Sequence, residues 1–187
     1  MRIVGGRFRG TALASVGAGD AKAHLRPTTD RVRETLFNLL AHGPYGDPVS
    51  GARVLDLFAG TGALGLEAIS RGAAEATFVD DGRKAGALIK ANIETLGIAS
   101  QTRLLRKDAQ KLGACASDPF DLIFLDPPYG KNLGTRALSA AGAGGWFAPS
   151  ALVVWEEAAI QAIPDGFSLR DHRRYGDTHL HILSADP

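Results

Sequence analysis

The sequence has a single cysteine, Cys115, so it cannot form an internal disulfide, which favours a reducing compartment such as the cytosol. It has no run of 18 or more apolar residues, so we expect no membrane-spanning helix. The first ten residues, MRIVGGRFRG, lack the continuous apolar stretch of a secretory signal. The five histidines show no metal-ligand spacing with Cys115. These absences predict a cytoplasmic protein that binds neither a metal nor a membrane.

Apart from these absences, the amino-acid composition is that of an ordinary globular protein. The chain has 187 residues, of which 45% are hydrophobic and 22% are charged. This length is enough for one full α/β domain with a small appendage. Because the sequence has no obvious surplus of apolar residues, we expect a monomer.

Positive charge is concentrated near the N-terminus. Residues 1–33 hold seven arginines and lysines against two aspartates, a net charge of +5, while the whole chain carries +1 and the other 154 residues therefore carry −4. A basic arm on a mildly acidic body is typical of a phosphate-binding extension beside a cofactor-binding core. A solvated surface without a partner explains the charge equally well, so charge alone leaves both interpretations open.

The first 45 residues predict a small extension. RIVGGRFRG is typical of a β-hairpin with Gly5 and Gly6 in its tight turn, and residues 11–24 predict a loop. In LRPTTDRVRETLFNLLAHG, Thr28 or Thr29 is placed to cap a helix. The expected apolar face of this helix consists of Val32, Leu36, Leu39 and Leu40.

From residue 52 onward, strand and helix patterns alternate. Strands are expected at 53–57, 75–80, 102–106, 120–125 and 151–155, with helices near 63–71, 83–96, 108–115 and 132–141. The stretch FSLRDHRRYGDTHLHIL predicts two further strands joined at Gly176-Asp177, the last of them antiparallel. The pattern predicts an α/β, Rossmann-like fold over residues 46–187, with a seven-stranded, mostly parallel sheet, helices on both faces and the hairpin-and-helix extension of residues 1–45.

A glycine-rich loop follows the first strand of this domain. VLDLFAGTGALGLEA contains Gly60, Gly62 and Gly65 in G-x-G-x-x-G spacing, and Asp80 ends the next strand twenty positions after Gly60. This context is typical of a nucleoside cofactor whose ribose hydroxyls are held by the acid. The motif alone does not distinguish between NAD, FAD and S-adenosylmethionine as the cofactor. The alternative is a purely structural turn that binds no cofactor.

Asp56 distinguishes between these cofactors. It precedes Gly60 by four residues, where a pyrophosphate would approach the helix. Two like charges about 4 Å apart repel by about 4 kcal/mol at an effective dielectric of 20. S-adenosylmethionine has no phosphate and carries a sulfonium and an ammonium, so a carboxylate at Asp56 favours it.

Further cofactor contacts are expected along the same loops. Asp108 follows the third predicted strand, where a carboxylate can accept a hydrogen bond from the adenine amine, although capping of a helix is an equally simple role. The complete predicted cofactor set is Asp56, Phe58, Ala59, Gly60, Gly62, Asp80, Asp81, Asp108 and Ala109.

The stretch DPPYG follows the fourth predicted strand. Asp126, Pro127, Pro128 and Tyr129 are expected at the carboxyl edge of the sheet, where prolines are tolerated because the ladder has ended. The prolines make a stiff bend. The carboxylate of Asp126 and the carbonyl of Pro127 are suited to hold the two N–H bonds of an exocyclic base amine, and the Tyr129 ring is suited to stack on a flipped base. An isolated D-P-P-Y is more often a surface turn, and the preceding strand reverses that preference.

Together, RIVGGRFRG, LRPTTDRVRETLFN, VLDLFAGTGALGLEAISRGA, FVDDGRKA and FLDPPYG resemble the bacterial small-subunit ribosomal RNA guanine-N2 methyltransferases, whose target is guanine 966 of 16S RNA. The resemblance covers residue 1 to about 183. It implies a class I methyltransferase that uses S-adenosyl-L-methionine. It also implies that the 16S RNA, within the 30S subunit or an assembly intermediate and together with ribosomal proteins, is the partner. The arginines expected to contact RNA are Arg7, Arg9, Arg26, Arg31 and Arg33.

Three other functions remain as alternatives. An adenine-N6 methyltransferase of DNA or RNA uses a similar amine-binding loop, but such enzymes more often have Asn at position 126 and a separate recognition domain. A non-catalytic RNA-binding assembly module is disfavoured by the intact polar motifs. A dehydrogenase is disfavoured by Asp56 and by the lack of an obvious hydride-transfer site.

Overall fold

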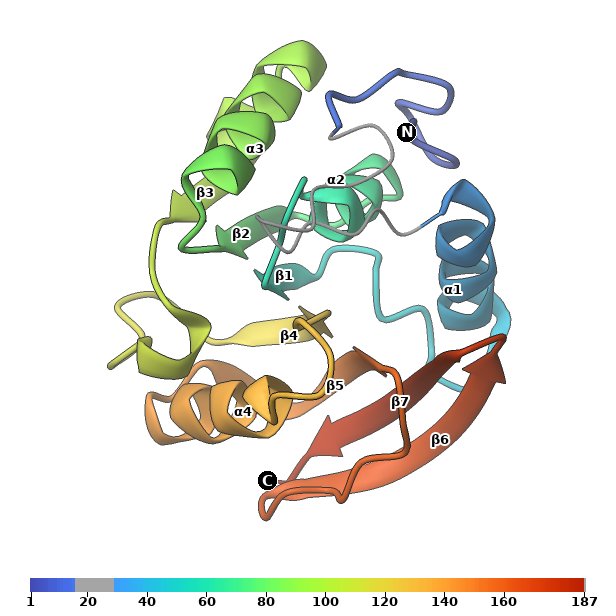
Figure 1. The fold of residues 1–187 in the computed structure, drawn as a ribbon. Coiled ribbons are helices and arrows are strands. Elements are labelled where there is room, and N and C mark those ends of the chain that lie inside the picture. Colours follow the sequence, from blue (N-terminus) through green and yellow to red (C-terminus); the bar gives the residue numbers. More distant parts are fainter. Residues whose placement is uncertain (16–28, 187) are drawn as a thin grey trace.

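The computed structural model describes residues 1–15 and 29–186 and contains one seven-stranded sheet (Figure 1). The strands are β1 (Arg53–Leu57), β2 (Glu75–Val79), β3 (Thr102–Leu105), β4 (Phe120–Leu125), β5 (Phe147–Glu157), β6 (Phe167–Tyr175) and β7 (Thr178–Ala185). They are arranged in the order β3-β2-β1-β4-β5-β7-β6. All pairs from β3 to β5 are parallel, whereas β7 is antiparallel to β5 and β6. The predicted sheet with a reversed last strand is confirmed.

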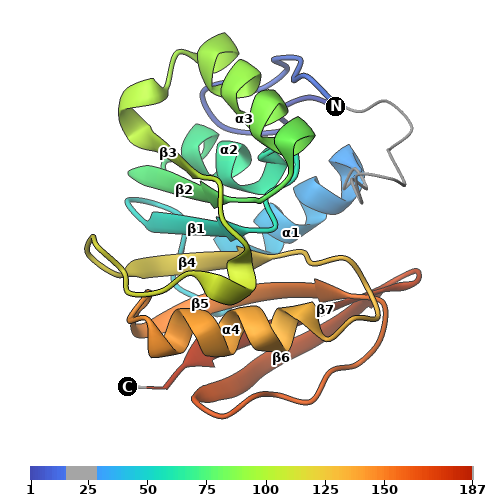
Figure 2. The ribbon, with the colours of Figure 1, turned by 60° about the vertical axis from the view of Figure 1, so that its left-hand side comes forward.

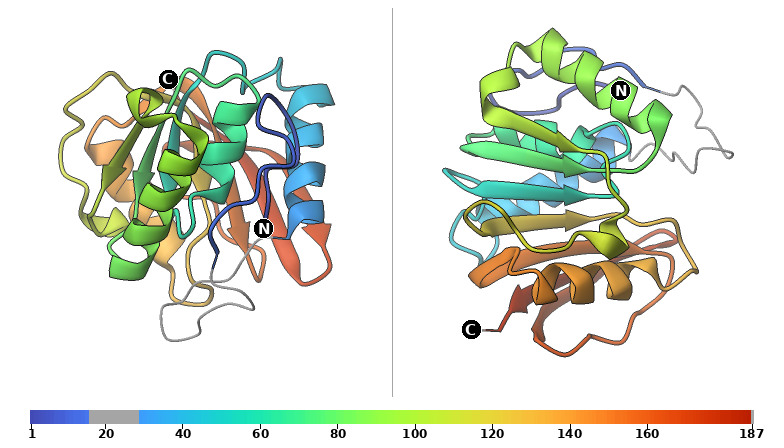
Figure 3. Two further views of the ribbon diagram at one scale, coloured as in Figure 1. Left: turned by 90° about the horizontal axis from the view of Figure 1, so that it is seen from above. Right: turned by 90° about the vertical axis from the view of Figure 1, so that its left-hand side faces the viewer.

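Helices cover both faces of this sheet (Figure 3). The helices α1 (Asp30–His42), α2 (Ala63–Ser70) and α3 (Arg83–Leu96) share one hydrophobic cluster, and α4 (Leu133–Ala143) belongs to a second cluster on the opposite face. Residues 1–15, which we call the arm from here on, also contribute to this core: Ile3 and Leu13 are buried in the first cluster. The predicted extension therefore packs on the same core as the sheet. None of the helices in the described ranges is long and apolar enough to cross a membrane.

The strand boundaries agree closely with the sequence prediction, except at β5. That strand was expected over 151–155 but begins at Phe147 and continues to Glu157. Its last two residues, Glu156 and Glu157, pair in register with Leu180 and His179 of β7. The extension adds two glutamates to the sheet edge next to the end of β4.

The expected helix over 108–115 is wrong, because only a single 3₁₀ turn forms, over Ala109–Lys111. Gly113 has a positive φ of 72°, which interrupts a right-handed helix. Its carbonyl accepts a hydrogen bond from Trp146 Nε1 at 2.8 Å, and the Cys115 N–H donates to the Gly144 carbonyl at 2.8 Å. The backbone groups of Gly113 and Cys115 therefore bind the turn after α4 and do not form the hydrogen bonds of a helix.

The expected tight turn at Gly5-Gly6 is also wrong, although the two sides of the arm do pair. An antiparallel bridge joins Arg2 and Ala12, and beside it the Ile3 N–H donates to the Thr11 carbonyl at 3.0 Å and the Leu13 N–H to the Met1 carbonyl at 3.0 Å. The N–H groups of Val4 and Gly5 donate to the Glu67 carboxylate of α2, at 2.9 and 2.8 Å, in place of cross-strand partners. The arm is therefore an antiparallel turn that is wider than predicted and is fastened to α2.

The start of α1 confirms one of the two predicted caps. Thr29 is the N-cap, and its hydroxyl accepts a hydrogen bond from the Val32 N–H at 3.3 Å. Thr28 lies outside the described residues. The buried face is shifted from the predicted one, because it contains Arg33, Leu36, Phe37 and Leu40.

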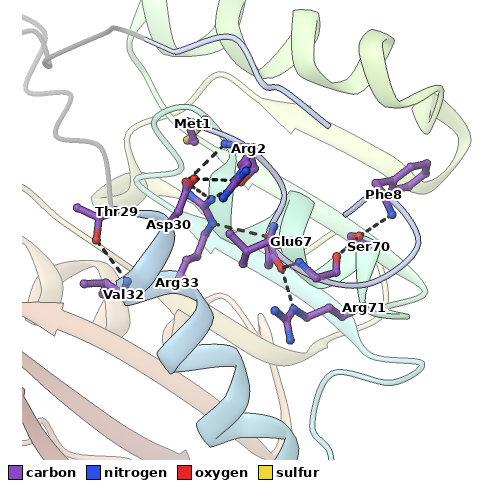
Figure 4. A network of polar contacts seen from close by, with 12 residues as sticks. Met1, Arg2, Phe8, Thr29, Asp30, Val32, Arg33, Glu67, Ser70 and Arg71 are labelled. Atoms are coloured by element: carbon purple, nitrogen blue, oxygen red, sulfur yellow. Dashed lines mark hydrogen bonds and ion pairs between the residues drawn. The ribbon is translucent and has the colours of Figure 1, made fainter. Parts of the chain in front are cut away.

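Arg33 is buried because α1 and α2 bring acidic groups to it (Figure 4). Its side chain is 0% exposed; it donates to the Asp30 carboxylate at 2.8 Å and to the Arg2 carbonyl, and it lies 3.7 Å from Glu67. Glu67, also 0% exposed, accepts a hydrogen bond from Arg71 Nε at 2.7 Å. This network joins the arm, α1 and α2.

Candidate active site

The strand register brings the predicted site residues to one edge of the sheet. Leu57 of β1 pairs with Val79 of β2 and with Leu125 of β4, and Leu125 pairs with Trp155 of β5. The residues that directly follow, which are Phe58, Asp80, Asp126 and Glu156, therefore occupy the next row. Because these strands are parallel, this row lies at the carboxyl edge, where open α/β sheets bind their ligands (Figure 2).

The glycine-rich turn after β1 is shaped by left-handed backbone. Gly60 and Gly62 have φ values of 58° and 78°, and Gly62 is the N-cap of α2. Phe58 also has a positive φ, 57°, which is uncommon for an aromatic residue. The buried Ala59 holds the turn by donating its N–H to the Val79 carbonyl at 3.1 Å. The loop thus keeps backbone groups close to the strand ends.

Asp80 ties this turn to the start of α3. Its carboxylate accepts the Gly60 N–H at 2.9 Å and the Gly82 N–H at 2.8 Å. Burial raises the pKa of Asp80, those two hydrogen bonds lower it, and the charge of Asp81 raises it. Asp81 itself is exposed. A carboxylate can accept about four hydrogen bonds, so Asp80 is able to hold a ribose hydroxyl as well.

Asp56 lies beneath the same turn. It is 2% exposed, and its carboxyl oxygen accepts the Gly65 N–H at 2.9 Å. Burial raises the pKa of Asp56 to about 8, the Gly65 hydrogen bond opposes this shift, and Asp80 adds to it. The predicted preference for a cationic cofactor requires a charged Asp56. Without a cationic ligand the group is mainly neutral at pH 7, so its preference for such a ligand is coupled to loss of a proton.

This raised pKa predicts a pH-dependent stability. Between about pH 4 and pH 8 the folded protein holds a proton on Asp56 that the unfolded chain has lost, so the contribution of Asp56 to the free energy of unfolding decreases as pH rises. Without cofactor, the stability difference between wild type and Asp56→Asn should change by up to about 1.4 kcal/mol per pH unit across this window. Urea denaturation at several pH values measures it. A constant difference would show that Asp56 is charged at neutral pH.

Gly65 allows α2 to pack closely on β2. A Cβ at this position would lie 2.5 Å from Phe78 Cε1 and 3.2 Å from Asp56 Oδ2. Gly65→Ala should therefore lower the free energy of unfolding by about 1–3 kcal/mol, as measured by chemical denaturation. Gly86→Ala in α3 is the matched control, because its Cβ would be 3.5 Å from the nearest atom and alanine favours a helix. Equal losses in the two variants would contradict this explanation.

Asp108 takes the capping role that the sequence left open. It is the N-cap of the 3₁₀ turn, and its carboxylate accepts hydrogen bonds from Gln110 N at 2.9 Å and Gln110 Nε2 at 3.1 Å. Ala109 behind it is buried. Asp108 lies beyond the end of β3, one strand away from Asp80, so the adenine contact stays a prediction alongside the cap.

The Asp-Pro-Pro-Tyr loop leaves the sheet directly after β4. Pro127 is buried, while Asp126, Pro128 and Tyr129 are half-buried. The Tyr129 hydroxyl donates to Glu156 Oε1 at 2.8 Å. Burial raises the pKa of Tyr129, and the charges of Glu156 and Asp126 raise it further. The loop thus presents a carboxylate and a fixed aromatic ring at the sheet edge.

Glu156 is a candidate site residue that was not predicted from the sequence. The strand predicted from the sequence ends at Trp155, and two consecutive glutamates are unusual inside a sheet. The residues before them, 151–155, are a continuous apolar run, which is the signal that this strand reaches the same edge as β4. Asn92 was missed as well; it is buried and links Ala14 of the arm to the Thr61 carbonyl in the glycine loop, by hydrogen bonds of 2.7 and 3.0 Å.

Among the described residues, three of the arginines predicted to bind RNA are exposed and one is buried. Arg33 is fully buried beside Asp30 and Glu67, so the predicted contact between Arg33 and RNA is wrong. Arg26 lies outside the described residues, and Arg31 is exposed at the start of α1.

Arg7 and Arg9 are exposed on the arm. The Arg7 N–H donates to the carbonyl of Ser70, the last residue of α2, and its side chain binds Gln101, just before β3 begins. These contacts place Arg7 at the amino edge of the sheet, opposite to Asp126.

The sheet order, the glycine turn after β1, the acid after β2 and Asp-Pro-Pro-Tyr after β4 define a class I methyltransferase. A family model described as Conserved hypothetical protein 95 matches residues 1–184, and the chain belongs to this family. Ribosomal RNA small subunit methyltransferase D of Escherichia coli K12 is 38% identical over 189 residues, covering 100% of this chain and 90% of the relative. The protein of the same name from Haemophilus influenzae is 38% identical over 181 residues, covering 94% and 89%.

A solved structure agrees with this membership. A methyltransferase from Escherichia coli superposes with a TM-score of 0.81 at 35% identity, covering 100% of this chain and 98% of the other. The family resemblance and the enzyme class predicted from the sequence are confirmed, and both imply use of S-adenosylmethionine.

Proposed function

We propose that the protein transfers a methyl group from S-adenosyl-L-methionine to the exocyclic N2 amine of a guanine in small-subunit ribosomal RNA, at the position corresponding to guanine 966. The observation that carries the proposal is the common row of Asp80, Asp126 and Glu156 at the end of parallel strands. Relatives named as methyltransferases of the small-subunit ribosomal RNA support the substrate class.

The residues beside β1 and β2 fit the cofactor. A carboxylate with spare acceptor positions at Asp80 suits ribose hydroxyls, and the buried acid Asp56 suits a cationic group. The turn formed by Phe58, Ala59, Gly60 and Gly62 is proposed to pack its backbone against the same ligand. The N–H groups of Ala59, Gly60 and Gly62 already donate to Val79, Asp80 and Ala59, so these three serve to hold the turn in place. The bound cofactor supplies an activated methyl group on its sulfonium.

The residues after β4 act on the target amine. The amine lone pair is conjugated into the guanine ring, so the nitrogen has to move towards tetrahedral geometry before it attacks. The Asp126 carboxylate and the Pro127 carbonyl hold its two N–H bonds and stabilise the positive charge that develops. Tyr129, oriented by Glu156, stacks on the flipped base. Because the displacement is in line, positioning provides most of the rate enhancement. The methylated nitrogen then returns to neutrality by losing one proton, either to the Asp126 carboxylate or to water.

The proposed substrate form is the 30S subunit or an assembly intermediate, in which ribosomal proteins also contact the enzyme, and the proposed enzyme is a monomer. Exposed Arg7, Arg9 and Arg31 are proposed to bind phosphates away from the target base. Arg26 belongs to the same proposal, although it lies outside the described residues.

The test uses purified protein, tritiated S-adenosylmethionine and 30S subunits from cells that lack their own enzyme for this position. Naked 16S RNA is assayed in parallel. Nucleoside analysis should recover the label as N2-methylguanosine, with 30S subunits as the better substrate. Label in N6-methyladenosine, or no label despite binding of the cofactor, would contradict the proposed reaction.

A further inference from the structure

Glu156 stands next to Asp126 at the edge of the sheet. β4 and β5 are neighbouring parallel strands in which Leu125 pairs with Trp155, so Asp126 and Glu156 follow at the same level. Neighbouring strands are about 4.8 Å apart. Phe124 and Val154, two residues earlier, lie in one hydrophobic cluster, so by alternation Asp126 and Glu156 project to that same face. The amine-binding carboxylate therefore has a second carboxylate beside it.

Tyr129 connects these two carboxylates. Its hydroxyl donates to Glu156 Oε1 at 2.8 Å, and the charges of both Asp126 and Glu156 raise its pKa. A base stacked on the Tyr129 ring would have the carboxylates of both Asp126 and Glu156 at the edge of the base. A carboxylate has two oxygens and about four acceptor positions, so one glutamate can serve several donors at once.

Guanine presents two neighbouring donors on its Watson–Crick edge, the N2 amine and N1–H. Adenine presents its N6 amine beside N1, which is an acceptor. In the proposed reaction, Asp126 and the Pro127 carbonyl hold the amine, so the N1–H of guanine needs an acceptor of its own. A carboxylate next to Asp126 provides this acceptor for guanine and repels the N1 lone pair of adenine.

We propose that Glu156 is a specificity-determining residue, whose carboxylate accepts the N1–H of the target guanine while it also holds Tyr129. This inference rests on the proposed function. It explains how a loop that is shared with adenine methyltransferases is restricted to guanine in this chain.

Glu157 does not fill this role, although it is adjacent in sequence. Successive residues of a strand point to opposite faces, and Glu157 is 2% exposed with its carboxylate accepting the Ala158 N–H at 3.3 Å. It pairs in register with His179. Its side chain is therefore directed away from Asp126.

The test uses an RNA base that keeps the amine but lacks N1–H. In 2-aminopurine the exocyclic amine is at C2 and N1 is an unprotonated acceptor. 30S subunits are assembled with 16S RNA that carries guanine or 2-aminopurine at the target position, and kcat/KM is measured for both. Wild type should favour guanine by at least about 100-fold, because a site built to accept an N–H rejects an analogue that lacks it. Comparable rates on the two bases would overturn the proposal without any variant.

Two variants separate recognition of the base from support of the ring. Glu156→Gln replaces an acceptor-only carboxylate by an amide that can also donate to N1, so it should reduce the preference for guanine at least 10-fold. Tyr129→Phe removes the hydroxyl but leaves the Glu156 carboxylate in place, so it should raise KM for the subunits and keep the preference. Cofactor affinity and thermal stability, measured for both, confirm that they fold.

The outcomes distinguish the inference from the function on which it rests. If Glu156→Gln leaves the preference unchanged, or if Tyr129→Phe reduces it equally, Glu156 does not read N1–H. If wild type forms no N2-methylguanosine on the guanine substrate, the proposed function itself is wrong.

Discussion

Replacement of Asp126 by alanine should lower the single-turnover rate of methyl transfer by about 10³-fold while the affinity for S-adenosylmethionine stays unchanged. The change removes one of two acceptors proposed to hold the target amine, and loss of one such group in other enzymes costs about 10²- to 10³-fold. The effect on cofactor binding is small because Asp126 follows β4, whereas the proposed cofactor residues lie at the ends of β1, β2 and β3. Rapid quenching with saturating 30S subunits measures the rate, and calorimetry measures the affinity.

Asp121→Ala is the matched control for this experiment. Asp121 is at the opposite end of the same strand, where its carboxylate accepts the Arg53 N–H at 2.9 Å. Its loss should leave the rate within a factor of about two, because it is remote from the reacting groups. A similar decrease in both variants would show that Asp126 acts through the stability of β4 and not through the amine.

Replacement of Glu67 by alanine should cause the largest loss of stability, about 3–5 kcal/mol. The carboxylate is fully buried, accepts two backbone N–H groups of the arm and the Arg71 Nε, and lies beside the buried Arg33 (Figure 4). Removal leaves a buried guanidinium and two arm N–H groups without this acceptor. Urea denaturation monitored by tryptophan fluorescence measures the change.

Glu94→Ala is the control for the Glu67 variant, because Glu94 is an exposed residue of α3. It should change the free energy of unfolding by no more than about 0.5 kcal/mol. If Glu67→Ala is no more destabilising than this control, the network of the arm, α1 and α2 does not hold the N-terminal residues to the core.

Local patterns in the sequence were sufficient for most of the fold. The boundaries of β1 and β4 follow from short apolar runs, and the end of α3 follows from Gly97, whose φ is 65°. The glycine turn and the Asp-Pro-Pro-Tyr loop were found because each comes directly after such a run. Their assembly at one edge follows from parallel pairing alone.

The errors arose where distant residues decide the local structure. Arg33 is an arginine on a helix, and nothing within α1 reveals that Glu67 of α2 lies beside it. Gly5 and Gly6 predict a tight turn, but the backbone of the arm binds Glu67 instead. The raised pKa of Asp56 depends on burial under α2, and the role of Glu156 depends on the pairing of β5 with β4. Pairwise contacts of this kind are not encoded in any short stretch.

The central claim is that one edge of the sheet holds the cofactor on the side of Asp80 and the target amine on the side of Asp126. The most direct test measures the single-turnover rate on saturating 30S subunits, as a function of S-adenosylmethionine concentration, for Asp80→Ala and Asp126→Ala. The Asp80 variant should require more cofactor but recover a rate near that of wild type at saturation, whereas the Asp126 variant should stay slow at every concentration. Recovery of the Asp126 variant at high cofactor concentration would contradict the claim, because Asp126 would then be a cofactor ligand.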